Sequence, residues 1–146
     1  MSTITELYDQ DYCAWALKNA ELLRQGRLAE IDLAHVVEEL EELMGNTRRE
    51  LYRRLRILLA HLLKWQRQPA ERSGGWAGTV RTQRQDIAKL FKDNPSLKRY
   101  LPEELRDAYG DAVELVAAET GRLMTDFPAA CPYTTEQVLS RDFWPD

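Results

Sequence analysis

The sequence predicts an all-α protein, a single-domain antiparallel (up-and-down) helical bundle with a long central helix and an extended C-terminal segment. Two observations lead to this prediction. Apolar residues recur at spacings of three and four along most of the 146 positions, and no useful run alternates between apolar and polar residues as a half-buried strand does. Glycine and proline number only 7 and 6, fewer than a loop-rich β-sandwich of this length needs. The length and a hydrophobic content of 44% fit one globular domain over residues 1–146.

The first two expected helices precede Gln68. One apolar stripe runs from Tyr8 to Leu23 and stops before Gly26, a typical helix-ending residue. A stronger stripe follows Asp32, which stands where an N-cap should, and it continues to Trp65. Gly45-Asn46 would divide this stripe into two helices, but one glycine costs only about 1 kcal/mol inside a helix. A single long helix from Asp32 to about Gln66 is therefore favoured.

The remaining helices are shorter and clearly bounded. A third extends from Trp76 to Phe91 and stops at Asn94-Pro95, because a residue before proline avoids the α region. A fourth begins at Pro102 and ends at Gly121. The chain is then extended, apart from a short helix that a capping box at Thr134–Gln137 would open.

Charge is strongly ordered along the chain behind a net value of −4. Residues 1–47 carry 3 basic and 10 acidic side chains, residues 48–99 carry 14 and 4, and residues 100–146 again carry 3 and 10. In the simplest interpretation the outer segments neutralise the middle one within the monomer. In the functional interpretation the middle segment presents a basic face to an anionic partner. The acidity of the whole chain disfavours nucleic acid as that partner.

Several functional classes lack their sequence signals. The first ten residues have neither the basic nor the apolar region of a signal peptide, and no apolar run reaches the roughly 20 residues of a membrane span. We therefore expect a cytoplasmic protein without membrane contact. No phosphate-binding loop, GxSxG elbow or HExxH motif is present, so no cofactor is expected. Cys13 and Cys131 are predicted to be reduced thiols, with a disulfide as the alternative.

An ordered set of short motifs resembles a bacterial family described as domain of unknown function 29. The resemblance covers the chain from about Tyr8 to Pro145, and the motifs are Tyr8-Asp9-x-Asp11, Ala14-Trp15, Leu22-Leu23-Arg24-x-Gly26-Arg27, Glu38-Glu39, His61-Leu62-Leu63-Lys64-Trp65, Gln68-Pro69, Arg72-Ser73, Gln83-Arg84, Pro95-Ser96-Leu97, Glu119-Thr120-Gly121, Phe127-Pro128 and Cys131-Pro132-Tyr133. It implies an all-helical, up-and-down fold. It implies no activity.

Two histidines suggest a small enzyme or metal protein. His61 would need acidic groups from another helix, and Asp11 and Glu39 are the candidate partners. His35 shares a helix face with three glutamates, Glu38, Glu39 and Glu42, in an arrangement that is a solvated acidic face or a metal or acid/base site. The structural interpretation of His61 is a hydrogen-bonded residue at the edge of a core. No metal is predicted.

The main functional hypothesis is a non-enzymatic interaction protein. Arginines follow helical spacing beside tryptophans on both sides of the loop near Pro69, and such groups bind acidic surfaces unless they pair within the chain. The predicted partner-binding residues are Arg72, Trp76, Arg81, Arg84 and Trp65. An acidic protein is the favoured partner, while the enzyme, nucleic-acid binding and a homodimer interface are the alternatives.

Overall fold

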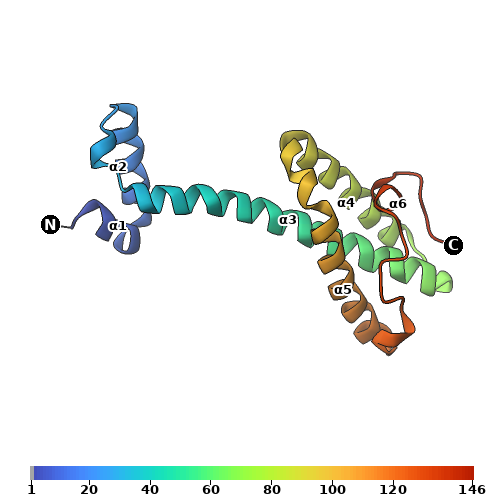
Figure 1. The fold of residues 1–146 in the computed structure, drawn as a ribbon. Helices are drawn as coiled ribbons and strands as arrows, with labels where there is room; N and C mark the ends of the chain where they lie inside the picture. The colour runs from blue at the N-terminus through green and yellow to red at the C-terminus, as the bar shows by residue number, and fades with distance from the viewer. Residues whose placement is uncertain (1) are drawn as a thin grey trace. The chain divides into compact units, whose positions relative to one another are not determined.

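The computed structural model describes residues 2–146, which form six α-helices and no β-strand (Figure 1). The helices are α1 (Ile4–Gln10), α2 (Tyr12–Arg24), α3 (Leu33–Arg67), α4 (Gly74–Asp93), α5 (Leu101–Thr120) and α6 (Thr135–Leu139). This confirms the predicted all-α helical bundle and its long central helix. The chain forms two compact units, a first unit that ends at Asn46 and a second unit that begins at Thr47. The single domain predicted over residues 1–146 stays a prediction.

The N-terminal stripe forms two helices where one was expected. The backbone leaves the helical region at Asp11, which ends α1 and becomes the N-cap of α2 by accepting a hydrogen bond from the Ala14 amide at 3.0 Å. Thr3 caps α1 in the same way, within a capping box that it forms with Glu6. Each orphan amide of a first helical turn needs such an acceptor, so Asp11 allows a second helix to start without a linker.

The central helix is continuous from Leu33 to Arg67, as the favoured interpretation predicts, and Gly45-Asn46 does not interrupt it. Asp32 precedes it, and one carboxylate oxygen of Asp32 lies 3.5 Å from the amide nitrogen of His35. The 35 residues of α3 are divided between the two units, because the boundary at Asn46 and Thr47 falls inside this helix. Its apolar stripe thus contributes to two separate sets of contacts.

In the first unit, few apolar side chains are buried. Trp15 and Leu22 are 4% and 6% exposed, and they are the buried hydrophobic residues among those described up to Asn46. Leu33 and Leu40 of the strong α3 stripe are 64% and 62% exposed. Helical periodicity predicted the helix here correctly, but it does not establish that the apolar side of a helix is covered.

The second unit has an extensive core. Six leucines on the second half of α3 are completely buried, namely Leu51, Leu55, Leu58, Leu59, Leu62 and Leu63. Val80 and Ile87 of α4 and Ala112 and Val116 of α5 are equally inaccessible to water. Full burial of a leucine or valine side chain contributes roughly 1.5–3 kcal/mol, so these layers supply the main apolar stabilisation of the second unit.

Part of the basic middle segment is neutralised inside the second unit. Arg48 pairs with Glu104 of α5 at 2.7 Å, and Arg54 pairs with Asp86 of α4 at 3.0 Å. Lys64 lies 3.3 Å from Glu119. The interpretation in which the acidic C-terminal segment neutralises the middle one is therefore correct for Arg48 and Lys64, whereas the partner of Arg54 belongs to the middle segment itself.

The C-terminal segment is largely non-helical, as predicted, and it follows Gly121, whose positive φ of 67° ends α5 in the left-handed region. The Tyr109 hydroxyl donates to the Pro128 carbonyl at 2.6 Å, and the Tyr133 hydroxyl bonds the side chain of Gln66 at 2.8 Å. Thr134 opens α6 with the expected capping box. Both cysteines are free thiols, and over residues 2–146 no helix combines the length and apolarity needed to cross a membrane.

Candidate functional site

The predicted basic residues lie beside two contacting tryptophans, Trp65 and Trp144. The rings of Trp65, at the end of α3, and Trp144 lie 4.5 Å apart at an interplanar angle of 41°. The Arg72 guanidinium lies 5.0 Å from the centroid of the Trp65 ring, and that of Arg81 lies 6.0 Å from the Trp144 ring. Cations this close to the face of an indole are attracted by its quadrupole. We call Trp65, Arg72, Arg81 and Trp144 the basic cluster.

Local structure positions the two arginines of the basic cluster. Arg72 lies between α3 and α4, and its Nε donates to the carbonyl of Trp65 at 2.8 Å, so it satisfies one of the last carbonyls of α3. Ser73 then begins α4 by accepting from the Trp76 amide at 3.2 Å. Arg81 follows on α4 and is exposed, and it has no carboxylate within ion-pair distance among residues 2–146.

Two of the predicted partner-binding residues are placed differently. The centroid of the Trp76 ring lies 5.4 Å from the Lys64 ammonium, and the tryptophan that contacts Trp144 is Trp65. Arg84 is only 3% exposed, and its Nε and Nη2 donate to the carbonyls of Val138 and Gln137 at 2.8 and 3.2 Å. These carbonyls lie at the end of α6, so Arg84 holds the C-terminal segment against α4. It is not a surface residue of the kind that the helical spacing suggested.

Trp144 was not among the predicted site residues. The sequence feature that could have indicated Trp144 is the aromatic pair Phe143-Trp144 close to the end of the chain. Its contact with Trp65 joins residues 79 positions apart. No local pattern predicts such a contact, because it depends on where the non-helical C-terminal segment returns to the bundle.

The residues proposed for an enzymatic site have structural partners. Asp11 caps α2, and Glu39 accepts hydrogen bonds from the hydroxyls of Tyr8 and Tyr12. In the second unit, His61 bonds the Ile57 carbonyl through Nδ1 at 2.8 Å, and burial, the largest cause, lowers its pKa. This is the expected arrangement of a histidine at the edge of a core. A reaction at His61, Asp11 and Glu39 stays a prediction.

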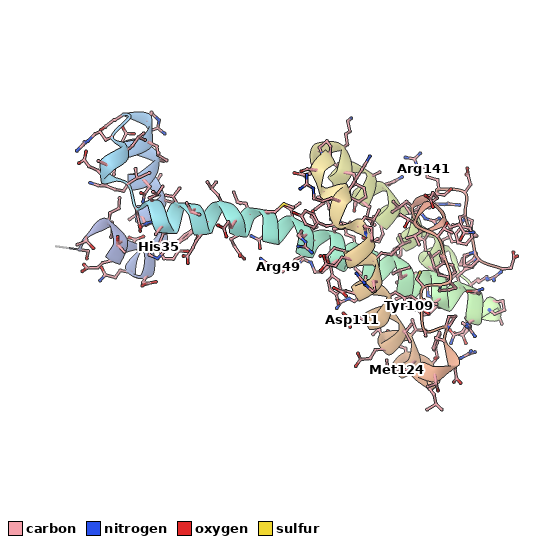
Figure 2. All side chains as sticks on the ribbon, in the orientation of Figure 1. His35, Arg49, Tyr109, Asp111, Met124 and Arg141 are labelled. Atoms are coloured by element: carbon pink, nitrogen blue, oxygen red, sulfur yellow. The ribbon has the colours of Figure 1, made fainter. Side chains whose placement is uncertain are left out.

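The first unit holds a second group of polar and aromatic side chains, centred on the buried carboxylate of Asp32. One of its oxygens accepts from Trp15 Nε1 at 2.9 Å and lies 2.7 Å from Nδ1 of His35 (labelled in Figure 2). The Tyr8 ring stacks on the His35 ring with centroids 3.9 Å apart. Asn19 completes the group, because its Oδ1 accepts from the Asp32 amide at 2.8 Å.

Hydrogen bonds in the first unit shift the pKa values of His35, Asp32 and Tyr8. The hydrogen bond with Asp32 raises the pKa of His35, more than burial lowers it. Burial alone would raise the pKa of Asp32, but hydrogen bonds from His35 and Trp15 outweigh it and lower that pKa. The hydrogen bond to Glu39 raises the pKa of Tyr8 to about 12, so the phenol stays a donor well above neutral pH. This arrangement favours a protonated His35 paired with an ionised Asp32.

The glutamates near His35 do not gather into a metal site. Nε2 of His35 lies 3.9 Å from the Glu38 carboxylate, while Glu39 is held by the two tyrosines. Over the whole described part of the chain, residues 2–146, no group of three or more histidine, cysteine, aspartate or glutamate side chains is placed to hold a metal ion.

Comparisons with known proteins give a family but no activity. No curated protein and no solved structure matches the chain. One family model matches it over residues 7–144, which is nearly the extent expected from the motifs, and the model is described as "Domain of unknown function DUF29". The order of the short motifs, more than any one of them, thus identified the relationship correctly, and the chain belongs to the DUF29 family.

Proposed function

We propose that this protein is a non-enzymatic interaction protein whose second unit binds an acidic protein partner through the basic cluster. One observation carries the proposal. Arg72 and Arg81 lie over a pair of contacting indoles and have no carboxylate within ion-pair distance in the described chain, whereas Arg48, Arg54 and Lys64 are paired. Arginine and tryptophan are both enriched among the residues that contribute most to binding at protein interfaces.

The charge of the second unit supports an acidic partner. Residues 47–146 carry 17 basic and 14 acidic side chains, while the residues before them carry 3 and 10. An acidic partner would therefore be attracted to the second unit and repelled by the first. Complementary charge raises the association rate and selects the binding orientation, and the indoles supply apolar area at the centre of the contact.

The test is capture of proteins on the immobilised full chain after nuclease treatment, with the captured proteins identified by mass spectrometry. We expect acidic proteins that are retained by the wild type and released as salt is raised. The variant carrying Arg72→Glu and Arg81→Glu should lose them. The control variant carries Arg53→Glu and Arg106→Glu, which make the same charge change at two exposed sites of the second unit outside the basic cluster.

Retention by both double variants would refute the proposal, because the basic cluster would then be unnecessary. Loss in both would show that overall charge, not the cluster, holds the partner. Circular dichroism and urea unfolding of each variant confirm that the helices persist. Capture that depends on nucleic acid would disappear after nuclease treatment and would favour the nucleic-acid alternative.

A further inference from the structure

A small polar hollow lies next to the basic cluster. It has a volume of about 290 Å³ and is lined by Arg81, Arg84 and Gln85 of α4 and by Arg141 and Asp142, which follow α6. Figure 2 shows Arg141 at the edge of the second unit. Three guanidinium groups face one carboxylate here, so the lining has an excess of two positive charges. We call these five residues the arginine pocket.

The arginines of the pocket have no acidic partner among residues 2–146. No carboxylate lies within ion-pair distance of Arg81, Arg84 or Arg141, and this includes Asp142. Arg81 and Arg84 instead lie 6.0 and 5.7 Å from the centroid of the Trp144 ring. Like charges held together in this way repel one another unless an anion lies between them.

Arg84 is the member that most needs a counter-ion. It is 3% exposed, and its Nη1 is buried without any hydrogen-bond partner, although Nε and Nη2 are bonded to carbonyls. A buried charge is costly when nothing compensates it. Since water does not reach Nη1, Arg84 would act on a ligand through its charge from beneath the pocket, while the exposed Arg81 and Arg141 would make the contacts.

We infer that the arginine pocket binds a phosphate monoester carried by the acidic partner, that is, a phosphorylated side chain. The inference rests on the proposed function, since Arg81 belongs to both the pocket and the basic cluster. A phosphate monoester carries nearly two negative charges at neutral pH, which match the excess of the lining, whereas a carboxylate carries one. Two guanidinium forks also suit the several acceptor oxygens of a phosphate.

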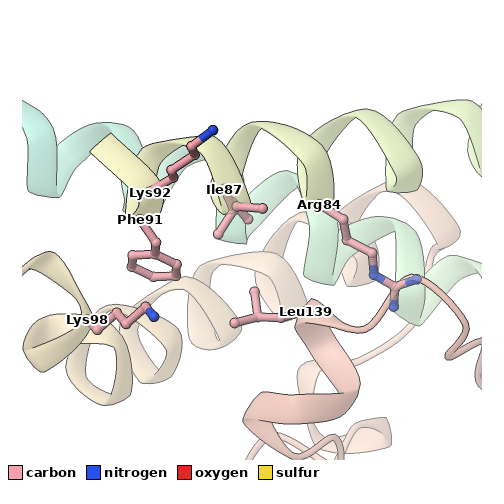
Figure 3. A pocket seen from close by; sticks show the side chains of 7 residues that line it. Arg84, Ile87, Phe91, Lys92, Lys98 and Leu139 are labelled. Carbon is pink, nitrogen blue, oxygen red and sulfur yellow. The ribbon is translucent and has the colours of Figure 1, made fainter. Parts of the chain in front are cut away.

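An adjoining apolar hollow indicates that the phosphate belongs to a peptide segment. It has a volume of about 370 Å³ and shares Arg84 with the arginine pocket. Figure 3 shows Ile87 and Phe91 of α4 opposite Leu139 of α6, with Arg84 at one end and Lys92 and Lys98 at the other. An apolar side chain next to the phosphorylated residue would fill this hollow, and free phosphate would leave it empty.

The experiment is isothermal titration of the full chain at low salt and pH 7.5 with three probes: a short peptide with phosphoserine next to leucine, the same peptide with glutamate in place of phosphoserine, and inorganic phosphate. We expect one phosphopeptide per chain and binding roughly tenfold weaker, or more, for the glutamate peptide. Arg81→Gln and Arg141→Gln should each weaken phosphopeptide binding by a similar factor. Arg106→Gln, an exposed arginine of α5, should leave it unchanged.

Lowering the pH gives a second readout of the same chemistry. The second pKa of a phosphate monoester is about 6, so phosphopeptide binding should weaken as the pH falls from 7.5 to 5.5, because the ligand loses a negative charge. Binding of the glutamate peptide should change little over that range, because the pKa of a glutamate side chain is about 4.3. Equal pH responses of the two peptides would contradict binding of a dianion.

The other outcomes also decide the question. Equal affinity for the two peptides would overturn the preference for phosphate, and inorganic phosphate binding as tightly as the phosphopeptide would overturn the assignment to a peptide segment. An equal loss of phosphopeptide binding in Arg106→Gln would show that the binding site is not the arginine pocket. If the basic cluster captures an acidic protein but the chain does not bind the phosphopeptide, this inference alone is refuted. If the chain binds the phosphopeptide but captures no acidic protein, the proposed function is refuted and the arginine pocket remains a phosphate site.

Discussion

Arg84 shows how one side chain ties the C-terminal segment to the bundle. Its two hydrogen bonds reach the carbonyls of Gln137 and Val138, which no longer have partners inside α6. Val138 itself is completely buried, so the same short helix is anchored by an apolar contact and by a cation. The Trp144 ring is held nearby, 5.7 Å from the Arg84 guanidinium.

Replacing Arg84 should therefore loosen the segment that carries Trp144. Arg84→Met keeps most of the side-chain volume but leaves both carbonyls unbonded, and we expect it to lower the free energy of unfolding by about 1–3 kcal/mol in urea. Arg81→Met, one turn earlier and exposed, should change it by no more than about 0.5 kcal/mol. Equal stability of the two variants would mean that Arg84 does not anchor the segment.

His35 makes the first unit sensitive to pH. Its pKa is raised, first by the hydrogen bond with Asp32 and then by the charges of Asp32, Glu38 and Asp9, so its contribution to stability is complete below its usual pKa of about 6.5. That contribution is lost as the pH rises through the raised pKa. We expect the first unit to unfold at lower urea concentration at about pH 9 than at about pH 6.

The indole resonance of Trp15 reports this unfolding, because its Nε1 donates to Asp32. His35→Gln should remove the pH dependence over this range, since glutamine does not titrate. A wild type whose unfolding midpoint is constant from pH 6 to 9 would show that the pair with Asp32 contributes nothing measurable. The pKa of Asp32 is lowered, so the stability that its ionised carboxylate contributes is lost only as the pH falls below the usual pKa of an aspartate.

At the scale of elements, α1 and α2 meet at a single residue that both ends one helix and caps the next. Asp11 supplies that cap, because its carboxylate accepts a hydrogen bond from the Ala14 amide in the first turn of α2. A shift of this boundary would move Tyr12, whose hydroxyl bonds Glu39. The cap therefore positions an aromatic residue of the first unit as well as starting a helix.

Asp11→Ala should lower the stability of α2 by about 1 kcal/mol, seen as faster amide hydrogen exchange through its first two turns. Asp11→Ser, which retains an acceptor of the right reach, should restore most of the protection. If Asp11→Ala exchanges as slowly as the wild type, Asp11 is not needed as a cap of α2.

For the whole molecule, the distribution of buried leucines separates the two units. Every fully buried large side chain, from Leu51 to Val138, belongs to the second unit. The first unit buries Trp15 and Leu22 among its described apolar residues and depends more on the polar group around Asp32. Marginal stability is expected of a unit that buries so little apolar surface.

Residues 47–146 should therefore fold when produced alone. We expect a helical circular dichroism spectrum and a single cooperative urea transition, since the core described for this unit lies entirely within it. Residues 1–46 alone should be only partly helical, which provides the comparison. A non-cooperative transition for residues 47–146 would show that the second unit depends on the residues before it.

Local signals in the sequence predicted most of the helices, most of their ends and the family, but they missed the break at Asp11 that separates α1 from α2. Periodicity, caps at Asp32 and Thr134, and glycine at 121 are local signals, and local hydrogen bonding decides them. The prediction that α3 continues through Gly45 is confirmed. The cost of one glycine inside a helix is small beside the stabilisation that a long apolar stripe provides.

Which cations remain without a carboxylate partner, and what surrounds them, follows only from the packing of the folded chain. Arg48 and Arg81 look alike in the sequence, but Arg48 meets a glutamate 56 positions away, whereas Arg81 meets Trp144. Arg84 is buried where it bonds the carbonyls at the end of α6, and Arg141, which follows α6, lines the pocket beside it. Charge pairing depends on distances between residues remote along the chain, and these distances follow from packing of the whole second unit rather than from the order of its side chains.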